Sequence, residues 1–197
     1  MQPNKDSSNE KNAFAVVAML AATPVVANEY EPAMAAFLND NIRTWAQDPI
    51  LVSAIKAQND VTAGYDQATI DQMDTTWRAE VGAAATPTIT PVIENPAADF
   101  LRTQVEASAG EITEIALMDS VGLNVALSGV NSDMWQGDEA KYQQTYSVGP
   151  EAYHFSEVEL DDSTRTYQVQ ISMTIVDPDT GTGIGAITVG VDAETLE

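Results

Sequence analysis

The chain has 197 residues, and its 30 acidic residues against eight Lys and Arg give a formal net charge of −22 and a pI near 4.1. This excess argues against nucleic acid and anionic membranes as partners, since both require a basic surface. Without cysteine, disulfides, thiol catalysis and Cys-ligated zinc are excluded, and a single histidine excludes a multi-histidine metal centre. We therefore expect one acidic domain without metal or cofactor, its acids hydrating the surface.

The first 27 residues are typical of an export signal. Lys5 and Lys11 precede an apolar run over residues 13–22, and small residues up to Ala27 suit a cleavage site there. The run is too short and too rich in alanine to span a bilayer, and no second apolar stretch of about 20 residues follows. We expect a signal peptide over residues 1–27, no membrane span, and a periplasmic or secreted location. The alternative is an amphipathic N-terminal helix.

Helical spacing dominates the next segment. Apolar residues recur three or four positions apart at Met34, Leu38, Ile42 and Trp45. An Asp48 cap followed by Pro49 begins a second piece, so the pattern predicts a long, slightly broken helix of roughly 28 residues ending near Asp60.

Two further helices are predicted before the sheet. One begins at Thr69, where Thr69 and Gln72 form a T-x-x-Q capping box, and it buries Ile70, Met73, Trp77 and Val81. A loop over residues 82–91 leads to a second cap-plus-proline start at Asn95 and Pro96, and this last helix closes near Gly110.

From Glu111 the apolar period changes to two. Strands are expected around residues 115–119, 123–127, 153–160, 167–176 and 184–191, with a tight turn over residues 120–122. Helices gathered before an antiparallel meander predict an α+β domain, in which the long N-terminal helix and the other helices pack on a five-stranded antiparallel sheet.

A polar and aromatic insert, NSDMWQGDEAKYQQTY over residues 131–146, interrupts the sheet between the second and third strands. The strongest strand has a polar second face, where Gln170 and Ser172 require water or a ligand to satisfy their hydrogen bonds. An apolar floor with a few convergent polar groups is typical of a small-ligand site.

Three stretches resemble a single Cache domain, the extracytoplasmic PAS-like sensor module of bacterial chemoreceptors and histidine kinases. They are IRTWAQDPILVSAIKAQN, MDSVGLNVALSGVNSDMWQGDEAKYQQTY and ISMTIVDPDTGTGIGAITVGVDAETL, and with the order of elements they extend the resemblance over residues 28–197. The resemblance implies a PAS-like sheet with a small-molecule pocket between one sheet face and the insert, which would serve as a lid. It also implies signal transduction through a membrane-bound partner, here from a free-standing exported form.

Eight residues are candidate ligand contacts, and six of them have a structural alternative. Trp135 could stack on a ligand or plug the lid onto the sheet, and Asp133 and Asp138 could contact a ligand or cap a short helix. Asp119 could belong to the turn after its strand. The remaining candidates, of which the tyrosines could instead be packing residues, are Tyr146, Tyr153, Gln170 and Ser172.

The insert lacks the arginine that holds the ligand carboxylate in amino-acid-binding Cache domains, and has only Lys141. Its acids and Trp135 suit a cationic or hydroxylated ligand, since carboxylates attract amines and indole faces attract quaternary ammonium groups. Two other functions stay open: a hydrolase that uses Asp or Glu, and a structural or adhesive surface protein without a ligand.

Overall fold

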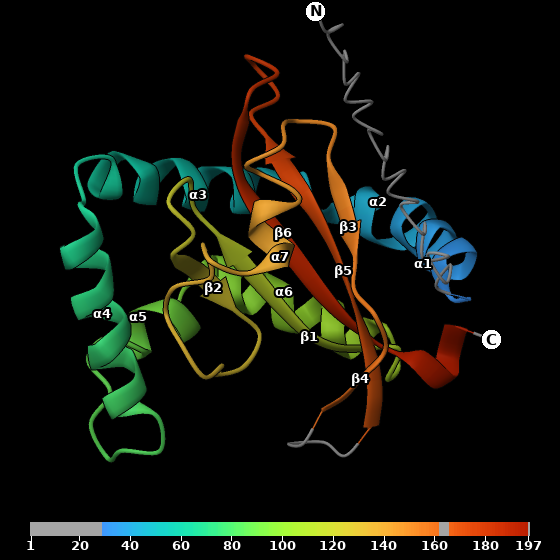
Figure 1. The fold of residues 1–197 in the computed structure, drawn as a ribbon, viewed down its shortest axis with the longest axis horizontal. Coiled ribbons are helices and arrows are strands. Elements are labelled where there is room, and N and C mark those ends of the chain that lie inside the picture. Colours follow the sequence, from blue (N-terminus) through green and yellow to red (C-terminus); the bar gives the residue numbers. More distant parts are fainter. Residues whose placement is uncertain (1–28, 162–165, 197) are drawn as a thin grey trace, which may run out of the picture.

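The computed structural model describes residues 29–161 and 166–196. The predicted signal peptide over residues 1–27 lies outside the described residues. The described chain begins with helices and continues into an antiparallel sheet, so it has the predicted α+β, PAS-like architecture (Figure 1).

The helical part forms a broken N-terminal helix followed by separate helices. The helical elements are α1 (Glu31–Phe37), the π-helix η1 (Leu38–Ile42), α2 (Arg43–Trp45), α3 (Pro49–Thr62), α4 (Gln67–Glu80), α5 (Thr90–Ile93), α6 (Pro96–Ala107), α7 (Ala140–Gln143) and the 3-10 helix η2 (Ala193–Leu196). The predicted break at Asp48 and Pro49 is confirmed, because the Asp48 carboxylate accepts the Ile50 N–H at 2.9 Å.

The predicted start of α4 is wrong by two residues. The cap is Asp66, whose carboxylate accepts the Thr69 N–H at 2.9 Å, so Thr69 lies inside the helix. An ionised Asp66 suits this position, and the hydrogen bonds from Thr69 lower its pKa. Val81, predicted to be buried, is exposed just beyond the helix end. The predicted loop over residues 82–91 also contains the beginning of α5.

Six strands form one antiparallel sheet in the described part of the chain. They are β1 (Ile112–Met118), β2 (Asn124–Leu127), β3 (Tyr153–Phe155), β4 (Glu159–Asp161), β5 (Thr166–Val176) and β6 (Gly183–Asp192), in the order β2-β1-β6-β5, with β3 and β4 both beside β5. The strand predicted over residues 153–160 is therefore two short segments of one edge, because the regular pairing with β5 is interrupted between Phe155 and Glu159.

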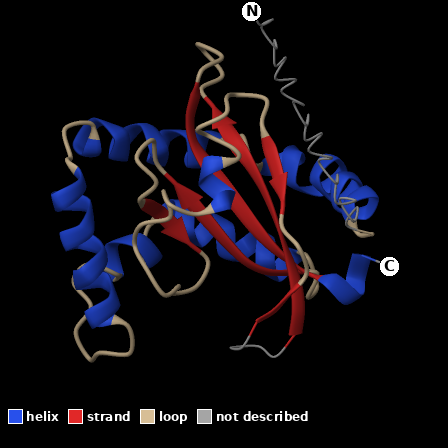
Figure 2. Cartoon of the chain, in the orientation of Figure 1, coloured by secondary structure: helices blue, strands red, loops and turns tan. Residues whose placement is uncertain are grey.

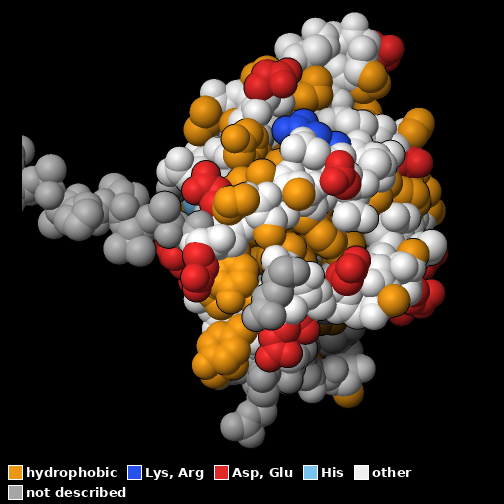
Figure 3. Space-filling model, turned by 90° about the vertical axis from the view of Figure 1, so that its right-hand side faces the viewer, with side chains coloured by type: hydrophobic (Ala, Val, Ile, Leu, Met, Phe, Trp, Pro, Cys, Tyr) orange, Lys and Arg blue, Asp and Glu red, His pale blue; other side chains and the backbone are white. Residues whose placement is uncertain are grey.

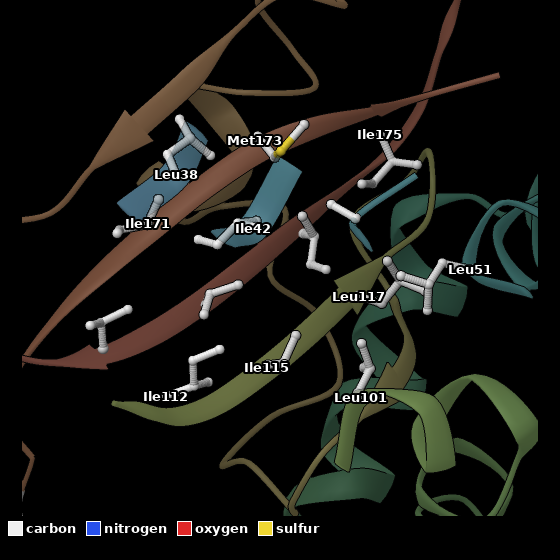
Figure 4. Close-up of a cluster of buried hydrophobic side chains, with 14 of the residues drawn as sticks. Leu38, Ile42, Leu51, Leu101, Ile112, Ile115, Leu117, Ile171, Met173 and Ile175 are labelled. Atoms are coloured by element: carbon white, nitrogen blue, oxygen red, sulfur yellow. The ribbon is translucent and has the colours of Figure 1, made fainter. Parts of the chain in front are cut away.

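One face of the sheet carries the main hydrophobic core. Leu117 from β1, Ile171 and Ile175 from β5 and Leu51 from α3 meet Leu101 of α6 there, all fully buried (Figure 4). The N-terminal helices, α3 and α6 cover this face, as the period-two pattern of β5 predicts.

The opposite face is covered by the segment between β2 and β3, which carries α7 across the front of the sheet in Figure 2. Tyr142 of α7 packs on Met118 and Ala186, and its ring lies 5.4 Å from that of Tyr146. The Tyr142 hydroxyl donates to the Ser120 carbonyl at 2.7 Å, and burial raises its pKa. The insert over residues 131–146, called the lid segment below, therefore lies against the sheet as expected.

The side of the molecule that carries the sheet edge has hydrophobic, acidic and basic side chains on its surface (Figure 3). Figure 3 shows hydrophobic side chains between scattered acidic ones and a small basic group. The exposed apolar side chains Tyr153, Leu160 and Tyr167 belong to β3, β4 and β5. None of the described helices is long and apolar enough to cross a membrane.

Candidate functional site

A cavity of about 370 Å³ lies between the second face of the sheet and the first half of the lid segment. Ala116, Gln170 and Thr188, from β1, β5 and β6, are part of its floor. Residues 129–133, Gln136, Glu139 and Lys141 form the opposing wall. We call this space the sheet–lid cavity, and its volume is within the range of small-molecule sites.

The floor of the cavity carries an unused amide. Gln170 lines the cavity, and its side chain has no hydrogen-bond partner among the residues that the structure describes. Ser172 lies two residues further along the same face of β5. It is fully buried, and its hydroxyl lies 3.0 Å from the Thr188 hydroxyl. Gln170 therefore offers a donor and an acceptor to a guest, and Ser172 orients Thr188.

The walls of the cavity carry three acids and one cation. Lys141 is only 13% exposed and its ammonium lies 3.0 Å from the Glu139 carboxylate. The Asp133 carboxylate pairs with Arg78 at 3.0 Å and also accepts the Gln136 amide at 2.8 Å. Glu114 has no ion pair or hydrogen bond within the described ranges, so its charge remains available at the exposed edge.

Helix α4 holds the first part of the lid segment, residues 131–136, which we call the lid limb. The Asp74 carboxylate accepts the backbone N–H groups of Met134 at 2.9 Å and Trp135 at 3.1 Å. The Trp77 indole donates to the Asn131 carbonyl at 3.1 Å, and Arg78 bridges Asp74 and Asp133. The wall of the cavity therefore depends on a helix that lies outside it.

Trp135 belongs to the lid limb, but its side chain does not line the cavity. Its indole N–H donates to the Val121 carbonyl at 2.9 Å, and its backbone pairs with Leu123 as an isolated bridge. Gly137 lies against the ring so closely that any side chain there would overlap the indole. This geometry favours the packing alternative, in which Trp135 fastens the lid limb to the turn after β1.

Asp119 is fully buried beneath the same turn, away from the cavity. One carboxylate oxygen accepts the N–H groups of Val121 and Leu123 at 2.9 Å, and the other accepts Gln58 and Thr62 of α3 at 3.0 Å. With four donors, this carboxylate joins helix α3 to the β1–β2 turn.

The other predicted contacts lie outside the cavity wall. Asp138 is exposed and does not cap α7, whose N-cap position is Glu139. Tyr146 stacks on Tyr142 at the far end of the lid segment. Tyr153 pairs with Met173 in the β3–β5 ladder and therefore faces the core side of the sheet, opposite Gln170. Of the eight candidates, the structure brings only Asp133 and Gln170 together at the cavity.

The sequence analysis did not select Thr188, Gln136 or Lys141 as contacts. Thr188 is the polar residue between Ala186 and Gly190 on one face of β6, a pattern that could have indicated a cavity floor. Gln136 and Lys141 had no comparable signal, because their direction depends on how the irregular lid segment folds back.

No group of three or more His, Cys, Asp or Glu side chains that could hold a metal ion occurs in the described part of the chain. Two of the three acids of the cavity wall, Asp133 and Glu139, are instead paired with Arg78 and Lys141.

No protein-family model matches this chain, and no curated protein matches it. Among solved structures, it is similar to the sensory domain of the Campylobacter jejuni chemoreceptor Tlp3, with 15% identity and a TM-score of 0.43 over 83% of this chain and 65% of that one. The V. cholerae histidine kinase DctB sensor domain gives 15% identity and a TM-score of 0.39 over 82% and 58%. An extracellular ligand binding receptor from Desulfohalobium retbaense gives 13% identity and a TM-score of 0.37 over 77% and 26%. The chain thus spans less than two thirds of the length of these structures, and the likeness is too distant to assign it their ligands.

Proposed function

We propose that this protein is a non-catalytic, small-molecule-binding sensor domain of Cache type. The observation that carries the proposal is the sheet–lid cavity of about 370 Å³, whose floor presents the unpartnered amide of Gln170. The amide atoms of Gln170 are accessible rather than buried without a partner, so a guest in the cavity can take the place of water as their hydrogen-bond partner. The lid segment would close on the guest, and α3 would be displaced as the output.

The ligand is proposed to be cationic or hydroxylated. The cavity has three acids against Lys141, and Glu114 is the acid without a partner in the described structure. An ammonium group would neutralise Glu114, whereas hydroxyl groups would satisfy Gln170 and Thr188. Under this proposal the domain is exported to the periplasm or the medium and passes its signal to a membrane-bound partner.

Native mass spectrometry of protein purified without refolding would show whether it carries a small molecule. Thermal-shift measurements with choline, putrescine and glucose, with succinate as the anionic counterpart, would then define the class. We expect a melting temperature that rises with the concentration of a cationic or hydroxylated probe. Saturation by succinate alone would contradict the proposed ligand class.

Two matched variants locate the binding. Gln170→Ala removes the free amide and should weaken binding about tenfold. Gln168→Ala removes a neighbouring amide on the same face of β5 and should leave binding unchanged. The side-chain oxygen of Gln168 already accepts the Thr113 hydroxyl at 2.8 Å. If no probe stabilises the protein, or if both variants behave alike, the sheet–lid cavity is not the binding site.

A further inference from the structure

A second hollow, also of about 370 Å³, lies on the other side of the lid limb. We call it the helix groove, because its walls come from α3, α4 and α5. The side chains used below are Ala54, Ala57 and Val61 from α3, Met73 from α4 and Val92 from α5. Met134 of the lid limb completes the wall, whereas its neighbours Asp133 and Gln136 line the sheet–lid cavity.

The lining of the helix groove is uncharged. Although the chain carries a net charge of −22, no Asp, Glu, Lys or Arg belongs to this wall. The polar donors are already committed: Asn95 donates to the Val125 carbonyl at 3.1 Å, and Gln58 and Thr62 donate to Asp119. The Tyr65 hydroxyl has no partner among the described residues, so it can meet one polar group of a guest.

The shape of the groove favours a small guest over a protein surface. Among its apolar lining residues, Ala57, Val61 and Pro91 are exposed at the rim, whereas Val92 and Met134 are buried, so the recessed apolar surface is the base of the groove. Partner proteins bind broad apolar patches, whereas recessed volumes of a few hundred Å³ bind small molecules. Met73 and Met134 are flexible side chains that adapt to different apolar shapes.

We propose that the helix groove is a second binding site, for uncharged, largely apolar small molecules that carry one hydroxyl-like group. This inference does not rest on the proposed function of the sheet–lid cavity.

The test uses 1-naphthol as the probe and methionine methyl NMR as the readout. Saturable shifts are expected at the Met73 and Met134 methyl groups, assigned through Met73→Leu and Met134→Leu. The methyl groups of Met34, Met118 and Met173 should not move, because these residues lie in other clusters. Naphthoate, which has the same rings with a carboxylate, should bind about tenfold more weakly or not at all.

Ala57→Leu fills the groove from an exposed helical position and should abolish binding of 1-naphthol. Ser53→Leu adds the same side chain to the same helix at an exposed position outside the groove and should leave binding unchanged. Should Ala57→Leu fail to fold, Val61→Asp places a charge at the exposed rim and should also weaken binding.

Three results would overturn the proposal. The first is no saturable shift at Met73 and Met134 up to the solubility limit of the probe. The second is equal binding by Ala57→Leu and wild type, or shifts confined to Met118. The third is a dimer in sedimentation velocity that Ala57→Leu disrupts, since the groove would then hold a second copy of the chain.

Discussion

At the scale of single residues, the carboxylates of this protein differ sharply in what surrounds them. Asp119 has no exposed surface and four donors, whereas Asp138 is exposed and has no hydrogen bond among the described residues. Both belong to a sequence crowded with acids, so residue type alone does not separate a structural carboxylate from a solvated one.

Asp119→Ala should lower the free energy of unfolding by about 3 kcal/mol, because it leaves buried donors from the turn and from α3 without an acceptor. Urea denaturation would measure the change. Asp138→Ala serves as the control and should stay within about 0.5 kcal/mol of wild type. Equal effects of the two substitutions would contradict the anchoring role of Asp119.

Trp135→Ala should destabilise the protein by about 2 kcal/mol, because the half-buried indole packs on Gly137 and donates to Val121. Chemical denaturation and ligand titration separate this effect from a direct contact. If Trp135 instead stacks on the ligand, the variant would keep its stability and lose only binding.

At the scale of elements, helix α4 is tied to the lid limb, because Asp74, Trp77 and Arg78 all bond to residues 131–135. Local opening of the lid limb therefore requires the loss of these bonds.

Asp74→Ala should speed hydrogen exchange at the Met134 and Trp135 amides about tenfold, because it removes their acceptor. Asp71→Ala, on the same helix, loses only an exposed bond from Gln67 and provides the control. Hydrogen exchange with mass spectrometry resolves the peptide over residues 131–136. Unchanged exchange in Asp74→Ala would show that the lid limb is held by its own packing.

The turn between β5 and β6 is anchored to α3 by Lys56, whose ammonium lies 2.9 Å from the Asp177 carboxylate. The hydrogen bond from Lys56 is the main cause that lowers the pKa of Asp177, and the bond to Asp177 raises the pKa of Lys56. A lowered carboxyl pKa stabilises the fold above the unfolded value near 3.8, and this stabilisation is lost as pH falls through the folded pKa. The raised pKa of Lys56 stabilises the fold at pH values below the pKa of the unfolded state, and this stabilisation is lost as the pH rises through the pKa of the folded state.

Wild type should therefore exceed Lys56→Gln in stability by a constant amount between about pH 5 and pH 9, and the difference should shrink below about pH 3. Denaturation curves of both proteins across this range provide the measurement. A difference that persists undiminished at pH 2 would show that Lys56 acts through packing of its aliphatic stem.

At the scale of the whole molecule, a net charge of −22 opposes compaction through self-repulsion. Monovalent salt screens this repulsion, so the melting temperature should rise by several degrees between about 0.02 M and 1 M salt. NaCl and KCl should act alike in calorimetry. A rise produced by micromolar Ca²⁺ alone would instead indicate a specific cation site.

The parts of the fold that depend on local chemistry were predictable from the sequence. Asp48 with Pro49 and Asn95 with Pro96 begin α3 and α6 as expected, and the alternation over β5 predicted a core face and a polar face. These signals need only neighbours a few positions away.

The parts that depend on distant partners were not predictable. Tyr153 faces the core side because it pairs with Met173, and an alternating pattern does not specify this register at a short edge strand. The donors to the Asp119 carboxylate include Thr62, which lies 57 positions away. The direction of Trp135 depends likewise on Val121 and Gly137, which come close only after the lid segment folds back.

The lid limb separates the two cavities, since Asp133 and Gln136 line the sheet–lid cavity and Met134 lines the helix groove. A ligand that displaces the lid limb would enlarge the cavity in which it is bound and reduce the volume of the other cavity. Binding at one cavity should therefore weaken binding at the other, even though the two ligands do not touch.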